Sequence, residues 1–158
     1  MRHGKAVGFG EGFVDYDRPL TFSGVSFVRE QGEILSSLIG NIESILYSPA
    51  KRTKSTMESI APFFPEARTR AVDRIYGARA PIIEDIIFEF PSFVQSLLIV
   101  GHNPGVSDLF SSYAKERFLF SPGSFGVVHF EVDEWSDILR TPAQSSRYQG
   151  SKSYREEL

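Results

Sequence analysis

Two short apolar runs, each ended by turn residues, constrain the fold of this chain more than any other feature. One lies in "ESILYSPAKR" at residues 43–48 and the other in "SLLIVGHNPG" at residues 96–101, and Pro49 and Pro104 stop them. A third run, from Gly126 to Val132, alternates in polarity and follows the turn-like "SPGS". Near-continuous apolar runs of strand length are typical of a sheet that is covered on both faces.

Helical patterns separate these predicted strands. Apolar residues at helical spacing, with Thr21 as a cap and Gly40 as an end, predict a first helix. Further helices are expected over residues 51–61 and 81–90 and just past Pro104. The order helix, strand, helix, helix, strand, helix, strand predicts an α/β fold, namely a three-layer α/β/α sandwich with a mostly parallel central sheet.

Length and charge limit the classes of protein that the chain can belong to. Its 158 residues suit one domain, expected over residues 1–140, and the polar residues 141–158 predict a mobile or loosely docked tail. The net charge of -3 argues against nucleic acid as a partner, because binding a polyanion requires a basic surface. No apolar run is long enough for a membrane helix and the start lacks a signal-peptide pattern, so no membrane and a cytoplasmic location are expected.

The chain offers few ligands for a metal. Cysteine is absent, which excludes thiolate sites, and the three histidines are widely separated. We therefore expect no metal and no cofactor.

Charged and titratable residues follow the predicted strands. Arg52 comes just after the first apolar run and His102 directly after the second, at the sheet edge where α/β proteins bind anions. If "RHG" also ended a strand, Arg2 and His3 would complete a phosphate pocket of two arginines and two histidines. Taken singly, Arg52 could equally be a solvated residue and His102 a structural histidine, and His129 is expected to be an ordinary strand residue.

Four strings carry a resemblance to a known family when they are read together and in order. They are "RHGKA" at residues 2–6, "DYDRPLTFSG" at 15–24, "SPAKRTKST" at 48–56 and "IVGHNPG" at 99–105. Together they resemble the phosphoglycerate mutase-like histidine phosphatase superfamily, and most closely its small SixA-type phosphohistidine phosphatases. The resemblance covers roughly residues 2–132 and implies a hydrolase that forms a phosphohistidine intermediate.

The resemblance assigns roles to matching residues. His3 matches the nucleophile, and Arg2, Arg52 and His102 match the groups that surround the phosphoryl oxygens. Arg18 matches a residue near the pocket mouth, and Asn103 is expected to lend its backbone N–H to the phosphate. A neutral His3 would attack while His102 stays cationic, and the pocket would accept inorganic phosphate or sulfate.

Two departures from the family pattern shape the functional expectation. Only Met1 precedes Arg2, where the family has an apolar strand, so we expect either a trimmed chain or a strand supplied in another way; without it His3 would hang from a frayed end. The second departure concerns the general acid. Candidates for this role are Glu11, Asp73, Glu84 and Asp85, but none of them lies in a recognisable motif. Lack of an acid favours a phosphohistidine-bearing protein as substrate, because an imidazole leaves more readily than an alkoxide. Small phosphoesters or diphosphates such as nucleotides, or a non-catalytic phosphate-binding module, remain as alternatives.

Overall fold

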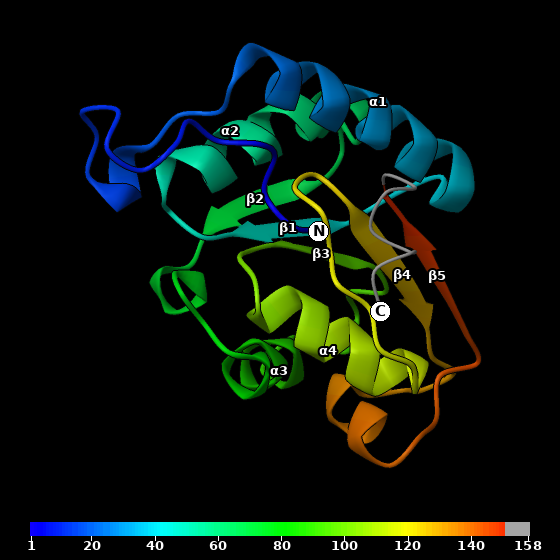
Figure 1. Cartoon of the computed structure of the whole chain (residues 1–158). Coiled ribbons are helices and arrows are strands. Elements are labelled where there is room, and N and C mark those ends of the chain that lie inside the picture. The colour runs from blue at the N-terminus through cyan, green and yellow to red at the C-terminus, as the bar shows by residue number, and fades with distance from the viewer. Residues whose placement is uncertain (151–158) are drawn as a thin grey trace.

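Helices and strands alternate along residues 1–150, the part of the chain that the computed structural model describes (Figure 1). The elements are α1 (Phe22–Ile39), β1 (Ser44–Tyr47), α2 (Lys51–Ile60), β2 (Arg68–Ala71), α3 (Ala80–Phe88), β3 (Leu97–Val100), α4 (Gly105–Ala114), β4 (Phe125–His129) and β5 (Ser145–Gln149). Short 3-10 helices occur at Asp15–Asp17, Ala61–Phe63, Asp73–Ile75 and Trp135–Leu139. The four helices and three of the strands agree with the sequence prediction.

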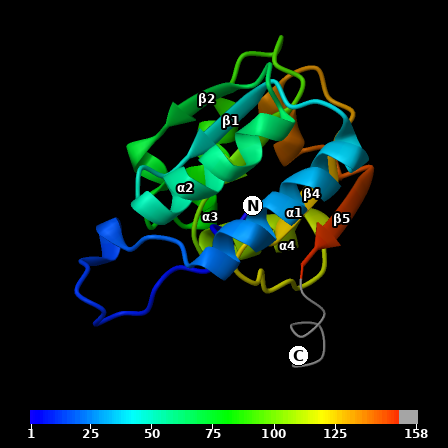
Figure 2. The ribbon, with the colours of Figure 1, turned by 90° about the horizontal axis from the view of Figure 1, so that it is seen from above.

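The strands form a parallel sheet and an antiparallel pair. β1 lies between β2 and β3 and is parallel to both, with Tyr47 opposite Val100, and β4 is antiparallel to β5. Helices α1 and α2 pack together on one side of the parallel sheet, and α3 and α4 pack together on the other (Figures 1 and 2). The predicted α/β/α sandwich is therefore confirmed.

The helices bury their apolar stripes against the sheet. α1 begins where Thr21 Oγ1 accepts a hydrogen bond of 3.0 Å from Gly24 N, and its Val28 and Leu35 join β1 and β3 in one core cluster. On the other side, Ile83 of α3 and Phe110 of α4 lie in a second cluster. Within residues 1–150, none of the helices has both the length and the apolar character needed to cross a membrane.

The amino end is held between the two sheets. The Met1 amine donates to Ile99 O at 2.8 Å, and Gly101 N donates to Met1 O at 3.0 Å, so Met1 lies beside β3. On the opposite side, Arg2 N donates to Ser124 O at 2.9 Å. His3 was expected to hang from a frayed end if no strand preceded it. In the structure, His3 N donates to Gly101 O at 3.1 Å and His3 O accepts from Gly123 N at 2.8 Å, so backbone hydrogen bonds fix it on both sides.

Two strands escaped the sequence prediction because their residues are polar. β2 is an edge strand whose four residues are all exposed. β5 lies in the segment predicted to be a mobile or loosely docked tail, and for residues 145–149 that prediction is wrong. Tyr148 of β5 is only 8% exposed, and its ring lies 5.0 Å from that of Phe120. The rest of the predicted tail, residues 151–158, lies outside the described residues.

Candidate active site

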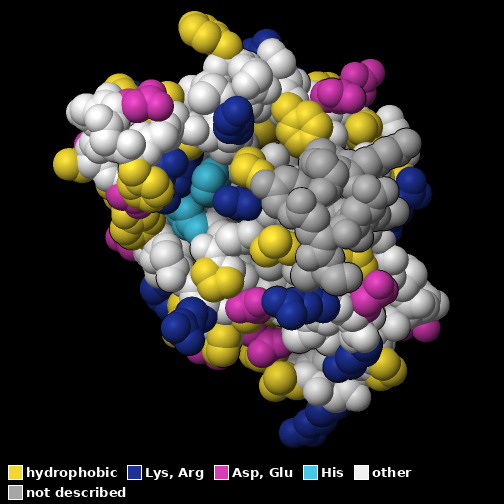
Figure 3. Space-filling view, in the orientation of Figure 1, with side chains coloured by type: hydrophobic (Ala, Val, Ile, Leu, Met, Phe, Trp, Pro, Cys, Tyr) yellow, Lys and Arg dark blue, Asp and Glu magenta, His cyan; other side chains and the backbone are white. Residues whose placement is uncertain are grey.

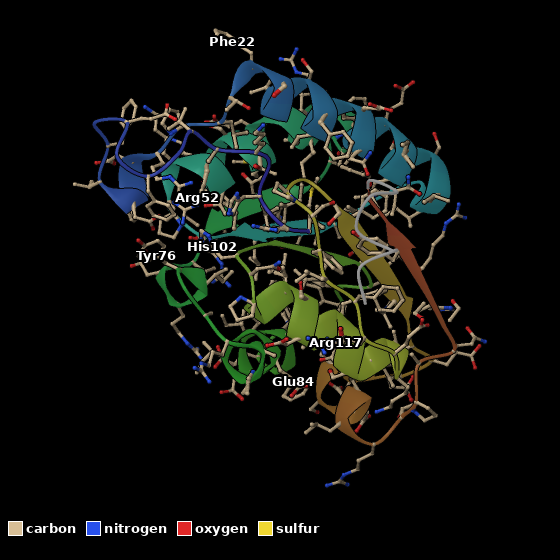
Figure 4. All side chains as sticks on the ribbon, in the orientation of Figure 1. Phe22, Arg52, Tyr76, Glu84, His102 and Arg117 are labelled. Atoms are coloured by element: carbon tan, nitrogen blue, oxygen red, sulfur yellow. The ribbon has the colours of Figure 1, made fainter. Side chains whose placement is uncertain are left out.

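The site forms where three chain segments leave the sheets. His3 ends the segment beside β3, Arg52 lies in the first turn of α2 after β1, and His102 follows β3. Arg52 and His102 point toward one another and toward Tyr76 in Figure 4. Figure 3 shows histidine and basic side chains gathered at this surface, with apolar side chains around them. The structure therefore brings together His3, Arg52 and His102, which the sequence predicted to share one pocket.

His3 is held in the tautomer that a nucleophile needs. Its Nδ1 lies 2.8 Å from Gly4 O, and a carbonyl can only accept, so Nδ1 carries the proton. Nε2 therefore carries the electron pair of the ring, and this pair accepts a hydrogen bond of 3.3 Å from Arg52 Nε. Burial lowers the pKa of His3 to about 3 against the raising effect of the bond to Gly4, and the charges on His102, Arg52 and Arg2 lower it further. His3 is thus neutral at pH 7.

A glycine after His3 is required by close packing. A Cβ on Gly4 would lie 2.7 Å from Val28 Cγ2 of α1, which is too close for two carbon atoms. Gly4 N also donates to the buried hydroxyl of Thr56 at 3.0 Å. The "RHG" string therefore places the His3 ring by fixing the backbone that follows it.

His102 is also neutral when only the groups of the protein surround it. Arg52 Nη2 lies 3.3 Å from His102 Nδ1, and because a guanidinium only donates, the imidazole proton sits on Nε2. Nε2 then donates to Ser48 Oγ at 2.8 Å. Burial lowers the pKa of His102 to about 4, as do the charges on Arg52 and Arg2, and the Asp15 charge opposes them. The expectation that His102 stays cationic is therefore not met by the protein groups alone.

Arg52 joins the two histidines. The side chain is almost wholly buried, with 6% of its surface exposed, and its Nη1 donates to the backbone oxygen of Asp15. The ring centroids of His3 and His102 lie 5.2 Å apart, so a single tetrahedral anion can reach both rings and the guanidinium. Lys51 and Lys54, the other cations of this turn, are exposed to solvent.

Asp15 forms the rim of the site, and no role was predicted for it from the sequence. Its Oδ2 accepts from Arg52 Nη2 at 3.1 Å and from the Tyr76 hydroxyl at 2.8 Å, and its Oδ1 accepts from Arg18 Nη1 at 2.9 Å. Burial raises the pKa of Asp15, but the bonds from Tyr76, Arg18 and Arg52 outweigh it and lower the pKa to about 2. Asp15 is therefore ionised at neutral pH. The sequence pointed to Asp15 only through its place at the start of "DYDRPL", and no sequence pattern pointed to Tyr76.

The remaining predicted residues lie around this centre. Arg18 lies at the rim, where it holds Asp15 rather than the histidines. Arg2 Nη1 donates to Phe120 O at 2.7 Å, and its charge lowers the pKa of both histidines. The Asn103 side chain donates to the same carbonyl at 3.0 Å, so it braces the loop before β4.

None of the four candidate acids is hydrogen-bonded to the histidines or to Arg52 among the described residues. Glu84 accepts from the Tyr113 hydroxyl and Glu11 from Gly8 N, and among the described residues no hydrogen bond joins these two, Asp73 or Asp85 to His3, Arg52 or His102. His129 is exposed on β4, as predicted for a strand residue. In residues 1–150, no group of three or more histidine and carboxylate side chains is placed to hold a metal ion.

Comparison with known sequences finds relatives whose own roles are not described. No family model matches the chain. An uncharacterized protein of Mycobacterium tuberculosis is 31% identical over 109 residues, which is 69% of this chain and 66% of the relative. The chain thus aligns with just under two thirds of that protein.

Solved structures show a clearer likeness. A protein of Agrobacterium tumefaciens assigned as a SixA phosphohistidine phosphatase is 27% identical, with a TM-score of 0.68 over 73% of this chain and 75% of its own. One from Nakamurella, also assigned as SixA, is 23% identical with a TM-score of 0.76 over 93% and 92%. The protein histidine phosphatase SixA in complex with tungstate is 20% identical, with a TM-score of 0.75 over 94% and 91%.

The fold, the order of the four motifs and the SixA-type neighbours agree. Phosphoglycerate mutase from Plasmodium falciparum shares the fold more distantly, at a TM-score of 0.53 over 85% of this chain and 86% of its own. The chain therefore has the phosphoglycerate mutase-like fold that these histidine phosphatases share.

Proposed function

We propose that the chain is a phosphatase that transfers a phosphoryl group to His3 Nε2, with protein phosphohistidine as its favoured substrate. The observation that carries the proposal is the hydrogen-bonded row of Ser48, His102, Arg52 and His3, in which the Nε2 electron pair faces the guanidinium. An anion at the guanidinium would lie within reach of that electron pair. Tungstate, a tetrahedral oxyanion, is bound by a SixA neighbour with the same fold.

The first chemical step breaks the bond between phosphorus and the leaving group. The Nε2 electron pair of His3 forms a new bond to phosphorus, and the leaving imidazole takes the bonding electrons and a proton from water. His3 keeps its Nδ1 proton, which Gly4 O holds. In the second step water attacks the phosphorus, the bond to Nε2 breaks with its electrons returning to His3, and inorganic phosphate leaves. The proton that the attacking water loses neutralises the hydroxide left by the first step.

The arginines supply the charge that the reaction requires. Three equatorial oxygens share the negative charge of the phosphoryl group in the transition state. Asp15 holds the planar guanidinium of Arg52 in place, and the donors that it now directs at His3 and His102 would turn to the phosphoryl oxygens when substrate binds. A bound phosphate dianion beside His102 would also raise the pKa of that imidazole and so favour its cationic form.

Asp15 supports the choice of substrate. A carboxyl group must be protonated to donate a proton to an alkoxide, yet the pKa of Asp15 is lowered to about 2. An imidazole leaving group makes a smaller demand because water can protonate it. The ionised carboxylate therefore favours phosphohistidine over phosphoesters of alcohols.

The contact between Asp15 and Arg52 also supports a second candidate, hydrolysis of small phosphoesters or diphosphates. The carboxylate lies 3.1 Å from a guanidinium nitrogen, and a phosphate bound there would raise the pKa of Asp15. The third candidate, a non-catalytic phosphate-binding module, needs no oriented nucleophile, and the hydrogen bonding of His3 gives it no support.

Competing substrates separate these candidates. We expect a phosphohistidine peptide to be hydrolysed with a kcat/KM at least about 100-fold above that of the matched phosphoserine peptide, because only the ester needs an acid. Asp15→Asn should then lower both rates by a similar factor through loss of support for Arg52. A loss confined to the phosphoserine peptide would make Asp15 the general acid and favour phosphoesters. No turnover of either peptide, with phosphate still bound, would favour the binding module.

A further inference from the structure

The loop that precedes α1 projects from the body of the molecule (Figures 1 and 2). A short stem closes this loop, because Ala6 pairs with Leu20 in an antiparallel bridge and Val7 N donates to Pro19 O at 3.0 Å. Beyond the stem, residues 8–14 are all exposed. The loop is therefore anchored at its base and presents its far end to solvent.

The exposed part of this loop carries large apolar side chains. Phe9 is 79% exposed, Val14 68% and Phe13 45%, and none of the three belongs to the core clusters that the described residues form. Large apolar side chains on an exposed loop beside a candidate site are typical of an interaction surface. These three residues are called the loop patch below.

Arg18 joins the loop patch to the active site. Its guanidinium lies over the Phe9 ring, 3.9 Å from the ring centre, and its Nη1 donates to Asp15 Oδ1 at 2.9 Å. Oδ2 of the same carboxylate accepts from Arg52 Nη2 at 3.1 Å, and the proposed function assigns Arg52 to the phosphoryl group. The loop patch therefore borders the phosphoryl-binding pocket, and Phe9 remains largely exposed there.

On the basis of the proposed function, we propose that the loop patch binds an apolar side chain of the substrate polypeptide, about three residues from its phosphohistidine. An extended chain covers about 3.3 Å per residue, so three residues span roughly 10 Å, which is the order of the path from Arg52 through Asp15 and Arg18 to Phe9. An apolar side chain gains free energy by leaving water against an exposed ring, and a small polar one gains little. The loop patch thus selects a polypeptide by the residues that flank its phosphohistidine.

The position of the loop patch favours the substrate over other partners. A phosphoryl group held at Arg52 brings the rest of its own chain to the same border, so a second contact at the loop patch is intramolecular and has a high effective concentration. Phe9 reaches Arg52 only through two other side chains. The contact therefore acts on KM rather than on the chemical step.

Two phosphohistidine peptides with glycine and serine flanks test the proposal. The first carries leucine at the third position on each side, so that either chain direction brings one leucine to the loop patch, and the second carries serine there. We expect kcat/KM to be about tenfold higher for the leucine peptide, through a lower KM, because leucine is buried against the ring. In Phe9→Ser this advantage should fall below about threefold. Hydrolysis of the serine peptide should persist, because Val7 O and Asp15 still hold Arg18.

Phe22→Ser is the matched control. Phe22 is almost wholly exposed at the start of α1 and lies away from Arg52 and His102 in Figure 4, so this variant should keep the full advantage of the leucine peptide.

Equal kcat/KM for the two peptides in the unmutated protein, or an advantage that survives in Phe9→Ser, would overturn the proposal, while turnover of the serine peptide would still support the proposed function. Turnover of neither peptide would contradict the proposed function as well. A dimer that sedimentation detects at the assay concentration, and that Phe9→Ser abolishes, would assign the loop patch to a second copy and overturn the proposal.

Discussion

At the scale of single residues, the site works by fixing where protons sit. Gly4 O holds the proton of His3 on Nδ1, and Ser48 Oγ holds that of His102 on Nε2. Arg52 faces the remaining nitrogen of each ring. In the proposed mechanism, the electron pair of His3 is thus the one that attacks, while the second imidazole is oriented toward the same guanidinium.

Ser48→Ala tests the positioning of His102. Without the hydroxyl, the imidazole loses the acceptor that selects its tautomer, and we expect kcat/KM to fall about tenfold. Ser44→Ala, at the start of the strand that precedes Ser48, is the matched control, since its hydroxyl makes only a 3.5 Å contact with Arg68 O. Steady-state kinetics on a phosphohistidine peptide measure both, and equal rates for the two variants would contradict this role for Ser48.

Tyr76→Phe tests how the rim holds Arg52. The variant removes the hydroxyl that donates to Asp15 Oδ2 at 2.8 Å and keeps the ring. Because Arg52 and Arg18 still hold the carboxylate, we expect a fall in kcat/KM of only about twofold to tenfold. The exposed Tyr16→Phe is the control, and a loss above 100-fold in Tyr76→Phe would instead mean that the Tyr76 hydroxyl acts directly on the substrate.

At the scale of elements, the sequence could predict the helices and strands that have a strong apolar pattern. The α1 stripe with its Thr21 cap and the apolar runs of β1 and β3 indicated elements within a few residues of their bounds. The polar β2 and β5 carry no such pattern because their stability comes from pairing with neighbours. Asp15 was missed for a related reason: only the fold brings it to Arg52, 37 residues away in sequence.

β5 is a structural part of the domain rather than a tail. Tyr148→Ala removes a ring packed against Phe110, Phe118 and Phe120, and we expect it to lower the free energy of unfolding by about 3 kcal/mol. The neighbouring exposed Arg147→Ala should change it by less than about 0.5 kcal/mol. Urea unfolding measures both values, and a Tyr148→Ala chain as stable as Arg147→Ala would show that β5 is dispensable.

At the scale of the whole molecule, burial of titratable groups predicts how stability depends on pH. The pKa values of the Met1 amine, His3 and His102 fall from 8.0, 6.5 and 6.5 to about 5, 3 and 4. Between the two values of each group, the unfolded chain binds a proton that the folded chain does not. The free energy of unfolding should therefore decrease steadily as the pH is lowered from 8 to 4.

His3→Gln isolates one part of this dependence. Between pH 4 and 6 it should reduce the slope by up to about 1.4 kcal/mol per pH unit, because glutamine does not titrate. Arg117→Gln, which removes an exposed charge elsewhere, is the control. Urea unfolding at several pH values gives the slopes, and an unaltered slope in His3→Gln would mean that His3 is not a buried neutral imidazole.

The proposed function requires His3 to receive the phosphoryl group, and an amino-terminal segment that joins the two sheets holds His3 in place. The most direct measurement is mass spectrometry of the protein quenched at neutral pH after brief mixing with a phosphohistidine peptide, with His129→Gln as the control. We predict one phosphoryl group on His3 in the unmutated and control proteins and none in His3→Gln. Phosphate on His102, or turnover that persists in His3→Gln, would contradict the account.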